Sequence, residues 1–373
     1  YLTSDQFAGS ASSISNVQAV EAIDEQTIEI NLASSDIEFP KRLAENGGAF
    51  FIAPKSVLED DPSKLEDTDY GSGPLTLVEW DQKNYIRFQA SESYHLAGAD
   101  GKPLPYFDEL KCDILSDEIQ RVNALADGSI DAVSRISPKV TSRLGTDTTV
   151  VKKPSGLQFP IILDTTIDPL DNVKVRQAIK HGLDRTEILE ATQGDGVLGH
   201  HSGITPVHGY YNSDLAVGDT FGTTAQPVKA TELLNEAGYN DGLSINETFY
   251  YDDGYPQKET IAVLFQQQMK DIGIEIDITQ ITEEDWLSNY WSQDGTWYVT
   301  NYSTRVLGET VPQLAIRTEG IWNEPHWTSA EFDDAFEKAL TATDPTVKRE
   351  SLDRCQVLNH REFTPPSCQF RYA

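Results

Sequence analysis

The sequence has few of the residues on which covalent, metal-centred or membrane-embedded chemistry depends. It contains one methionine and three cysteines, which stand far apart at Cys112, Cys355 and Cys368. Three isolated thiols give no CxxC motif and no disulfide framework, so we interpret them as incidental or buried thiols. No run of about 18 apolar residues occurs, and the sequence therefore predicts no membrane-spanning helix.

Positive charge is also scarce. Lys and Arg total 29 against 60 Asp and Glu, which gives a net charge of −31. Nucleic acid is excluded as a partner because its phosphates need cationic residues. The acids are scattered rather than clustered, so we interpret them as a solvated acidic surface and not as a cation-binding site. Such a surface is typical of proteins from high-salt environments, and we predict a halophilic source.

Familiar catalytic motifs are missing as well. No G-x-S-x-G, Walker, H-E-x-x-H or G-x-G-x-x-G pattern occurs. His200, His201 and His208 could hold a metal, but histidines in such a loop are more often surface residues. Asp252 and Asp253 could be the acid–base pair of a glycosidase, but adjacent acids in a glycine-containing turn are more often turn formers. We therefore expect no cofactor, no metal and no catalysis.

The length and the order of the patterns point to two or more lobes with interleaved strands and helices. A chain of 373 residues exceeds the size of one usual hydrophobic core. Alternating apolar residues predict strands at 17–23, 28–32, 75–78, 85–88, 130–133 and 274–278. Helical spacing predicts helices at 117–128 and 256–271, and capping patterns predict helices that begin at Asp171 or Asn172, Asp184, Pro227 and Thr328. This mixture predicts an α/β or α+β class.

Large aromatic side chains are concentrated in one later stretch, residues 286–327. It includes Trp286, Trp291, Trp297, Tyr298, Tyr302, Trp322 and Trp327. Such residues line concave ligand sites, where they combine apolar area with a polar group. A core rich in large rings is the alternative interpretation, and the pattern alone does not decide between the two.

A series of motifs in a fixed order carries a family resemblance. The motifs are Gly71-Ser72-Gly73-Pro74-Leu75 with Trp80, Tyr94-His95 before Pro105-Tyr106-Phe107-Asp108, Arg121-x-Asn123-Ala124-Leu125 with Gly128 and Ile130-Asp131, Pro169-Leu170-Asp171-Asn172 with Val175-Arg176-Gln177-Ala178-Ile179 and Leu183-Asp184-Arg185, and Ala230 with Leu233-Leu234 and Glu236-Ala237-Gly238-Tyr239. With these motifs the chain resembles the family 5 extracellular solute-binding proteins of dipeptide, oligopeptide and nickel importers. The stretch from Trp322 to Asp333 is similar to one branch of that family. We interpret most of these motifs as scaffold, with Arg176 on an exposed helix face.

The resemblance implies an α/β, two-lobed periplasmic-binding-protein fold of type II, similar to cluster C. Residues 1–69 resemble the end of the variable second domain, 70–157 part of the first lobe, and 158–373 the second ligand-binding lobe. The family's N-terminal part is absent, and the sequence after Glu362 departs from the family pattern. We therefore expect a fragment that is incomplete at its N-terminus and at its C-terminus.

The resemblance also implies a function and a place in the cell. It implies a monomeric substrate-binding protein of an ABC importer, outside the membrane, secreted or anchored as a lipoprotein, in a halophilic archaeon. Such a protein captures a peptide or peptide-like solute by lobe closure and delivers it to the membrane permease. Two alternatives stay open: a secreted hydrolase acting on a glycan or peptide, and a receptor domain of the same fold.

The resemblance further suggests where a solute would bind. In dipeptide-binding members an acid that holds the ligand amine follows a tryptophan, and Arg305 stands at the corresponding place here. Asp253 falls where the family's carboxylate-binding arginine is expected. We expect Arg305 to pair with an anionic ligand group, with Tyr302 and Trp322 beside it. The alternative is an internal ion pair between Arg305 and Glu309. The candidate ligand-binding residues are Tyr302, Arg305, Trp322, Trp297, Asp253 and Glu309.

Overall fold

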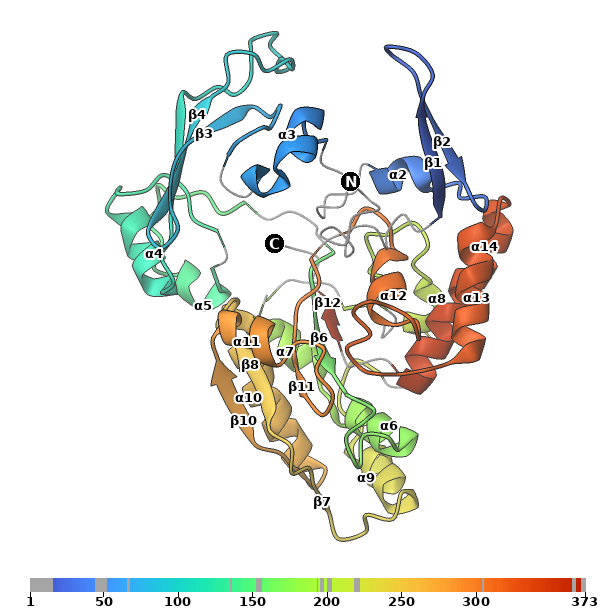
Figure 1. Cartoon of the computed structure of the whole chain (residues 1–373). Coiled ribbons are helices and arrows are strands. Elements are labelled where there is room, and N and C mark those ends of the chain that lie inside the picture. The colour runs from blue at the N-terminus through green and yellow to red at the C-terminus, as the bar shows by residue number, and fades with distance from the viewer. Residues whose placement is uncertain are drawn as a thin grey trace. The chain divides into compact units, whose positions relative to one another are not determined.

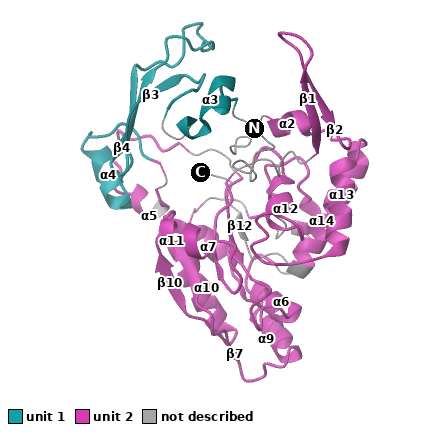
Figure 2. Ribbon diagram, viewed as in Figure 1, with its two compact units in different colours: residues 1–7, 50–133 teal, residues 8–49, 134–373 magenta. Residues whose placement is uncertain are grey.

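The chain divides into two compact units in the computed structural model. The structure describes residues 16–43, 52–65, 68–134, 136–151, 156–192, 194, 198–199, 203–217, 222–303, 305–363 and 367–369. One unit contains residues 1–7 and 50–133, and the other contains residues 8–49 and 134–373 (Figures 1 and 2). The sequence predicts lobe boundaries after residues 69 and 157. These boundaries divide the chain differently from the two compact units, and they stay a prediction.

The first unit is built around a three-stranded antiparallel sheet. The sheet has the order β3-β4-β5, from β3 (Leu75–Asp81), β4 (Tyr85–Ala90) and β5 (Glu109–Asp113). Its helices are α3 (Lys55–Asp60), the short η3 (Pro62–Leu65) and α4 (Glu118–Ala126). Asp117 caps α4 by accepting a hydrogen bond from Gln120 N–H at 2.7 Å, and Gly128 follows with a φ of +78°. The predicted strands at 75–78 and 85–88 and the helix at 117–128 are confirmed.

One predicted strand of this unit is wrong. Residues 130–133 form no strand. Both Ser129 N–H and Ile130 N–H donate to the Ala124 carbonyl, at 2.9 and 3.2 Å. The N–H of Ile130 thus helps to close the last turn of α4, where a strand would need it for a neighbouring strand.

The second unit contains a five-stranded mixed sheet with the order β10-β8-β11-β6-β12. Its strands are β6 (Gln158–Ile162), β8 (Phe249–Asp252), β10 (Ile278–Ile281), β11 (Trp297–Val299) and β12 (Ser367–Gln369). β8 is parallel to β10 and β11, whereas β6 is antiparallel to β11 and β12. The strand predicted at 274–278 is divided: β9 (Ile274–Glu275) pairs with β7 (Leu243–Ser244), and the chain then passes to β10 in the larger sheet.

Helices pack on this sheet through a large apolar core. They include α6 (Val173–Gly182), α7 (Arg185–Thr192), α9 (Pro227–Glu236) and α10 (Pro256–Asp271). Phe249, Phe265 and Trp297 are fully buried there, with their ring centroids 5.0 to 6.0 Å apart. Burying such rings is the main favourable contribution to folding in this unit.

Local signals set the ends of these helices much as the sequence predicts. The side chain of Asn172 accepts a hydrogen bond from Lys174 N–H at 3.0 Å, and that of Asp184 from Glu187 N–H at 2.9 Å. Pro227 lies in the first turn of α9, and Gly238 follows that helix with a φ of +100°. The prediction that Arg176 is exposed is wrong. Its guanidinium is buried because it donates to the carbonyls of Leu170 and Asp171, which precede the helix.

A second, smaller core lies among the later helices, between α13 (Ala330–Thr341) and α14 (Pro345–Leu358). The other helices of this unit are α5 (Pro138–Thr141), α8 (Ser213–Val217), α11 (Glu283–Asn289), α12 (Thr310–Ala315) and η4 (Asn359–Phe363). α13 and α14 pack through Phe332, Phe336 and Leu352. The cap of α13 is Ser329, whose Oγ accepts from Phe332 N–H at 3.3 Å, one residue later than the predicted Thr328. The hairpin of β1 (Val17–Ala22) and β2 (Ile28–Leu32) and the helix α2 (Phe39–Leu43) also belong to this unit.

Truncation of Phe265 should destabilise the second unit strongly. The ring is fully buried between Phe249 and Trp297, so Phe265→Ala should lower the free energy of unfolding by about 3 to 5 kcal/mol. Val263→Ala is the control on the same helix, since Val263 is 48% exposed and should cost less than about 1 kcal/mol. Denaturant unfolding followed by tryptophan fluorescence measures both. Similar losses in the two variants would contradict the packing of α10 described here.

Candidate ligand-binding site

Aromatic and charged side chains meet around one buried carboxyl of the second unit, that of Glu324. Glu324 is 1% exposed. Tyr298 donates its hydroxyl to Glu324 Oε2 at 2.9 Å, and Tyr302 donates to Oε1 at 2.9 Å. The side chain of Trp291 is a third hydrogen-bond partner of the carboxyl. The loop at residues 322–327 is thereby joined to β11 and to the segments before and after it.

Burial governs the charge of this carboxyl. It raises the pKa of Glu324 to about 7, although the hydroxyls of Tyr302 and Tyr298 and the side chain of Trp291 favour the ionised form. Burial, with the nearby Glu324 charge, also raises the pKa of both tyrosines well above the ordinary value. The tyrosines therefore remain hydrogen-bond donors, and Glu324 changes charge near neutral pH.

A row of rings leads from this carboxyl toward two cationic side chains. The ring centroids of Trp286 and Trp291 are 6.0 Å apart, and those of Trp291 and Trp322 are 5.9 Å apart. At one end the Arg305 guanidinium carbon lies 5.6 Å from the Trp322 ring centroid. At the other end Lys258 Nζ lies 5.0 Å from the Trp286 ring centroid. Both distances are typical of cation–π contacts.

The two cations differ in what balances their charge. Lys258 is fully buried and forms an ion pair with Asp252, which is 1% exposed. Burial lowers the pKa of Lys258, and the charge of Asp252 opposes that effect. Arg305 is only partly buried, and its Nε is enclosed without a hydrogen-bond partner.

The backbone that carries Arg305 is anchored by hydrogen bonds. His208 Nδ1 accepts from Thr205 N–H at 3.2 Å, so the neutral ring carries its proton on Nε2. That Nε2 then donates to the Arg305 carbonyl at 2.9 Å. Upstream, the backbone of Tyr302 exchanges hydrogen bonds of 3.0 and 3.1 Å with Gln158.

Of the predicted site residues, the structure places Arg305 beside Trp322 and joins Tyr302 to Glu324, which lies in the same loop as Trp322. The other three lie elsewhere or serve other contacts. Trp297 is fully buried in the core, where its indole N–H donates to the Glu247 carbonyl at 2.9 Å, so it is a core residue. Asp253 is exposed and accepts from Glu283 N–H at 2.9 Å, at the first turn of α11. It supports a helix start, whereas its neighbour Asp252 is buried against Lys258.

Glu309 does not pair with Arg305, so the internal ion pair considered for Arg305 is wrong. Glu309 is 1% exposed, and its Oε1 lies 3.1 Å from Lys348 Nζ and 3.7 Å from Arg42 Nη2. The carboxylate is thus directed at α14 and α2, because a buried acid requires nearby cations.

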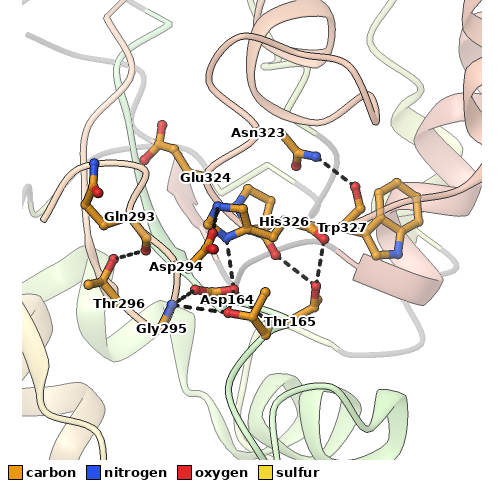
Figure 3. Close-up of polar contacts among 12 residues, drawn as sticks. Asp164, Thr165, Gln293, Asp294, Gly295, Thr296, Asn323, Glu324, His326 and Trp327 are labelled. Atoms are coloured by element: carbon orange, nitrogen blue, oxygen red, sulfur yellow. Dashed lines mark hydrogen bonds and ion pairs between the residues drawn. The ribbon is translucent and has the colours of Figure 1, made fainter.

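The loop at residues 322–327 contains residues that the sequence reasoning missed. His326 lies between two acids, with Nδ1 3.0 Å from Asp164 Oδ1 and Nε2 3.0 Å from Asp294 Oδ1 (Figure 3). Asp164 is fully buried and also accepts from Thr166 and from Gly295 N–H, the latter at 2.7 Å. Thr165 donates its hydroxyl to the His326 carbonyl at 2.9 Å. One feature of the sequence could have pointed to this cluster: Glu324 and His326 stand between Trp322 and Trp327.

The electrostatics of this cluster favour a protonated histidine. The hydrogen bond to Asp164 raises the pKa of His326, against the effect of burial. Burial alone would raise the pKa of Asp164, but the hydrogen bonds from His326 and Thr166 outweigh it and hold that pKa below its ordinary value.

No group of metal-binding side chains occurs in the part of the chain that the structure describes. His200 and His201 lie outside the described residues, and His208 uses its ring nitrogens for Thr205 and Arg305. Among the described helices, none is both long and apolar enough to cross a membrane.

Glu324 should make stability depend on pH near neutrality. Its folded pKa of about 7 lies above the ordinary value of 4.5, so its contribution is present at low pH and is lost as pH rises through 7. Between pH 5 and pH 8 that loss is about 2 to 3 kcal/mol. Glu324→Gln should remove this dependence on pH. Glu319→Gln is the control, because Glu319 is exposed and its substitution should leave the dependence unchanged. Unfolding free energies at the two pH values test this, and an unchanged difference in Glu324→Gln would contradict it.

The His326 cluster should stabilise the protein within a different pH window. The raised pKa of His326 means that its contribution is complete below pH 6.5 and is lost as pH rises through the folded pKa. The lowered pKa of Asp164 means that its contribution is lost as pH falls below 3.8. His326→Asn keeps a residue that tolerates the φ of 51° and should cost about 1 to 3 kcal/mol at pH 5 and less at pH 9.

Asp294→Asn is the control for this pair, because Asp294 is 85% exposed and its ion pair should contribute little. Thermal unfolding at pH 5 and pH 9 measures all three proteins. A loss of the same size at both pH values in His326→Asn would show that the charge of the ring is not involved.

Comparison with known proteins gives the chain a family. The family model described as bacterial extracellular solute-binding proteins, family 5 (middle part), matches residues 1–312. The glutathione-binding protein GsiB of Escherichia coli (strain K12) is 27% identical over 267 residues, which are 71% of this chain and 49% of GsiB. GsiB of Salmonella typhi matches with the same identity and coverage. The chain spans about half the length of the curated relatives it matches.

Solved structures share the fold over nearly the whole chain. The periplasmic binding protein DppA of Helicobacter pylori, in complex with the peptide STSA, has a TM-score of 0.83 at 18% identity, with 99% of this chain and 72% of that chain covered. AgaA of A. tumefaciens R10, in complex with agropinic acid, has a TM-score of 0.80 at 20% identity and covers 100% and 74%. AppA of Bacillus subtilis, in complex with a nonapeptide, has a TM-score of 0.77 at 22% identity and covers 97% and 73%.

These likenesses show the α/β fold of the type II periplasmic binding proteins, which is the fold class expected from the sequence. Because the family model matches most of its residues, the chain belongs to family 5 of the extracellular solute-binding proteins.

Proposed function

We propose that the chain is the substrate-binding part of an ABC importer, which captures a peptide or peptide-like solute outside the membrane and delivers it to a permease. Membership of family 5 supports this proposal. The observation that carries it is the group formed by Tyr302, Arg305 and Trp322, which combines partly exposed rings with a cation that has a free Nε. Such a combination of apolar area and few polar groups is typical of solute sites.

The relatives support a peptide-like solute. GsiB is named for glutathione, and the DppA and AppA structures hold peptides. Binding would act by selecting a closed arrangement of the lobes, since a solute that contacts both lobes stabilises only that arrangement. The protein would act as a monomer, secreted or membrane-anchored, from a halophilic source.

The proposed function includes no catalysis. A glycosidase typically uses a pair of available carboxyls, but Asp252 is buried in an ion pair with Lys258 and Asp253 accepts from the start of α11. A receptor domain of the same fold is the remaining alternative. Neighbouring genes for permease and ATPase subunits would favour the importer, whereas a gene for a signalling partner would favour the receptor.

Removal of the Trp322 ring should weaken solute binding. Native mass spectrometry of the purified full-length protein should detect a retained solute, which returns unchanged after release. Trp322→Ala should reduce its affinity roughly 30-fold, because a buried aromatic contact is typically worth about 2 kcal/mol. Val228→Ala is the control, since Val228 is 75% exposed on α9. Chemical conversion of the solute, or equal affinity in Trp322→Ala, would contradict the proposal.

A further inference from the structure

We infer that the site selects solutes that carry an acidic group, and that the Arg305 guanidinium forms the ion pair with that group. The inference rests on the proposed function, because it names the chemical class of the same solute.

The guanidinium of Arg305 is held in place but its hydrogen bonding is incomplete. Its carbon lies 5.6 Å from the centroid of the Trp322 ring, and its Nε is enclosed without a hydrogen-bond partner. The residue as a whole is only partly buried, so a solute can reach it. Nε itself is out of reach of a solute, so an anionic group would approach the part of the side chain that remains accessible.

Acidic side chains near Arg305 are already committed to other partners. Glu309 stands four residues later but pairs with Lys348 and Arg42. Glu324, in the same loop as Trp322, is held by the hydroxyls of Tyr298 and Tyr302. No ion pair among the described residues includes Arg305. In a chain with 60 acids and 29 bases, a cation that is left without an acid is available for a ligand.

A second arginine shows why stacking alone does not make a site. The Arg349 guanidinium carbon lies 5.4 Å from the Tyr210 ring centroid, which is the same kind of contact. Arg349 is exposed, however, and its Nη2 donates to the Gly209 carbonyl at 2.8 Å. Arg305 differs because it is only partly exposed, its Nε is buried without an acceptor, and it lies beside the aromatic row.

The backbone under Arg305 is preorganised. His208 donates to the Arg305 carbonyl at 2.9 Å, and Tyr302 is fixed to Gln158 by two backbone hydrogen bonds. A guanidinium on an anchored backbone and close to a ring has few orientations available, so little freedom is lost when a carboxylate binds. A carboxylate matches the planar fork with two parallel hydrogen bonds, which a neutral amide cannot do as well.

The test uses four tripeptides and isothermal titration calorimetry on the purified full-length protein at one ionic strength. The peptides are Ala-Ala-Ala, its C-terminal amide, and the C-terminal amides of Ala-Glu-Ala and Ala-Gln-Ala. The wild type should bind an acid-bearing peptide roughly 10- to 100-fold more tightly than its neutral counterpart. A preference within the first pair assigns the acid to the peptide terminus, and a preference within the second pair assigns it to a side chain.

Substitution of Arg305 should abolish this preference. Arg305→Gln should bind acidic and neutral peptides with affinities within roughly threefold, and Arg305→Lys should retain part of the preference because it keeps the charge but loses the planar fork. Arg349→Gln is the matched control and should behave as the wild type. Circular dichroism and the unfolding midpoint of each variant establish that it is folded.

Three outcomes separate this inference from the proposed function. A wild type that binds neutral and acidic peptides equally well overturns the acid selectivity but leaves the solute-binding function standing. A folded Arg305→Gln that keeps the preference overturns the assignment to Arg305. A wild type that binds none of the four peptides overturns the peptide-binding function, and the selectivity that rests on it is overturned as well.

Discussion

The arrangement of the site depends on the burial of one carboxyl, that of Glu324. A carboxyl taken out of water needs hydrogen-bond donors, and here they come from Tyr298 in β11, from Tyr302 beyond it, and from Trp291 before it. Because these donors come from segments on both sides of a central strand, satisfying the carboxyl also fixes those segments. Trp322 stands two residues before Glu324 and is thereby placed against Trp291 and under Arg305.

The same loop is held a second time by His326 and Asp164. Asp164 follows β6, and its carboxylate contacts His326 and the backbone of Gly295, so the end of one strand, the loop before β11 and the 322–327 loop meet there (Figure 3). Both anchors weaken as pH rises. The His326 pair loses the proton of the ring, and the buried Glu324 becomes ionised, a form that the tyrosine hydroxyls only partly compensate. The loop is therefore held by two polar contacts whose strength depends on pH near neutrality.

Cations are few in this chain, and the second unit uses them in two ways. Lys258 and Lys348 are fully buried and lie against Asp252 and Glu309, where each offsets an acid that the fold encloses. Arg305 instead lies against a ring with no acid beside it. A permanently charged, planar group suits that position, because it stays ionised next to apolar surface and still forms two parallel hydrogen bonds with a carboxylate.

The family, the α/β class and most of the local structure follow from the sequence alone, because caps, glycine positions and apolar spacing act within a few residues. α10 begins and ends where the pattern predicts, and Gly238 follows α9 with positive φ. The sequence also grouped Tyr302, Arg305 and Trp322, through the family register. The folded chain was needed to show that Trp297 is core while Trp322 is partly exposed, and that Glu309 pairs with Lys348. It was also needed to show that Glu324 and His326 organise the site. The contacts of Glu324 and His326 join residues that are 22 to 162 positions apart in the chain, and no local pattern contains such distances.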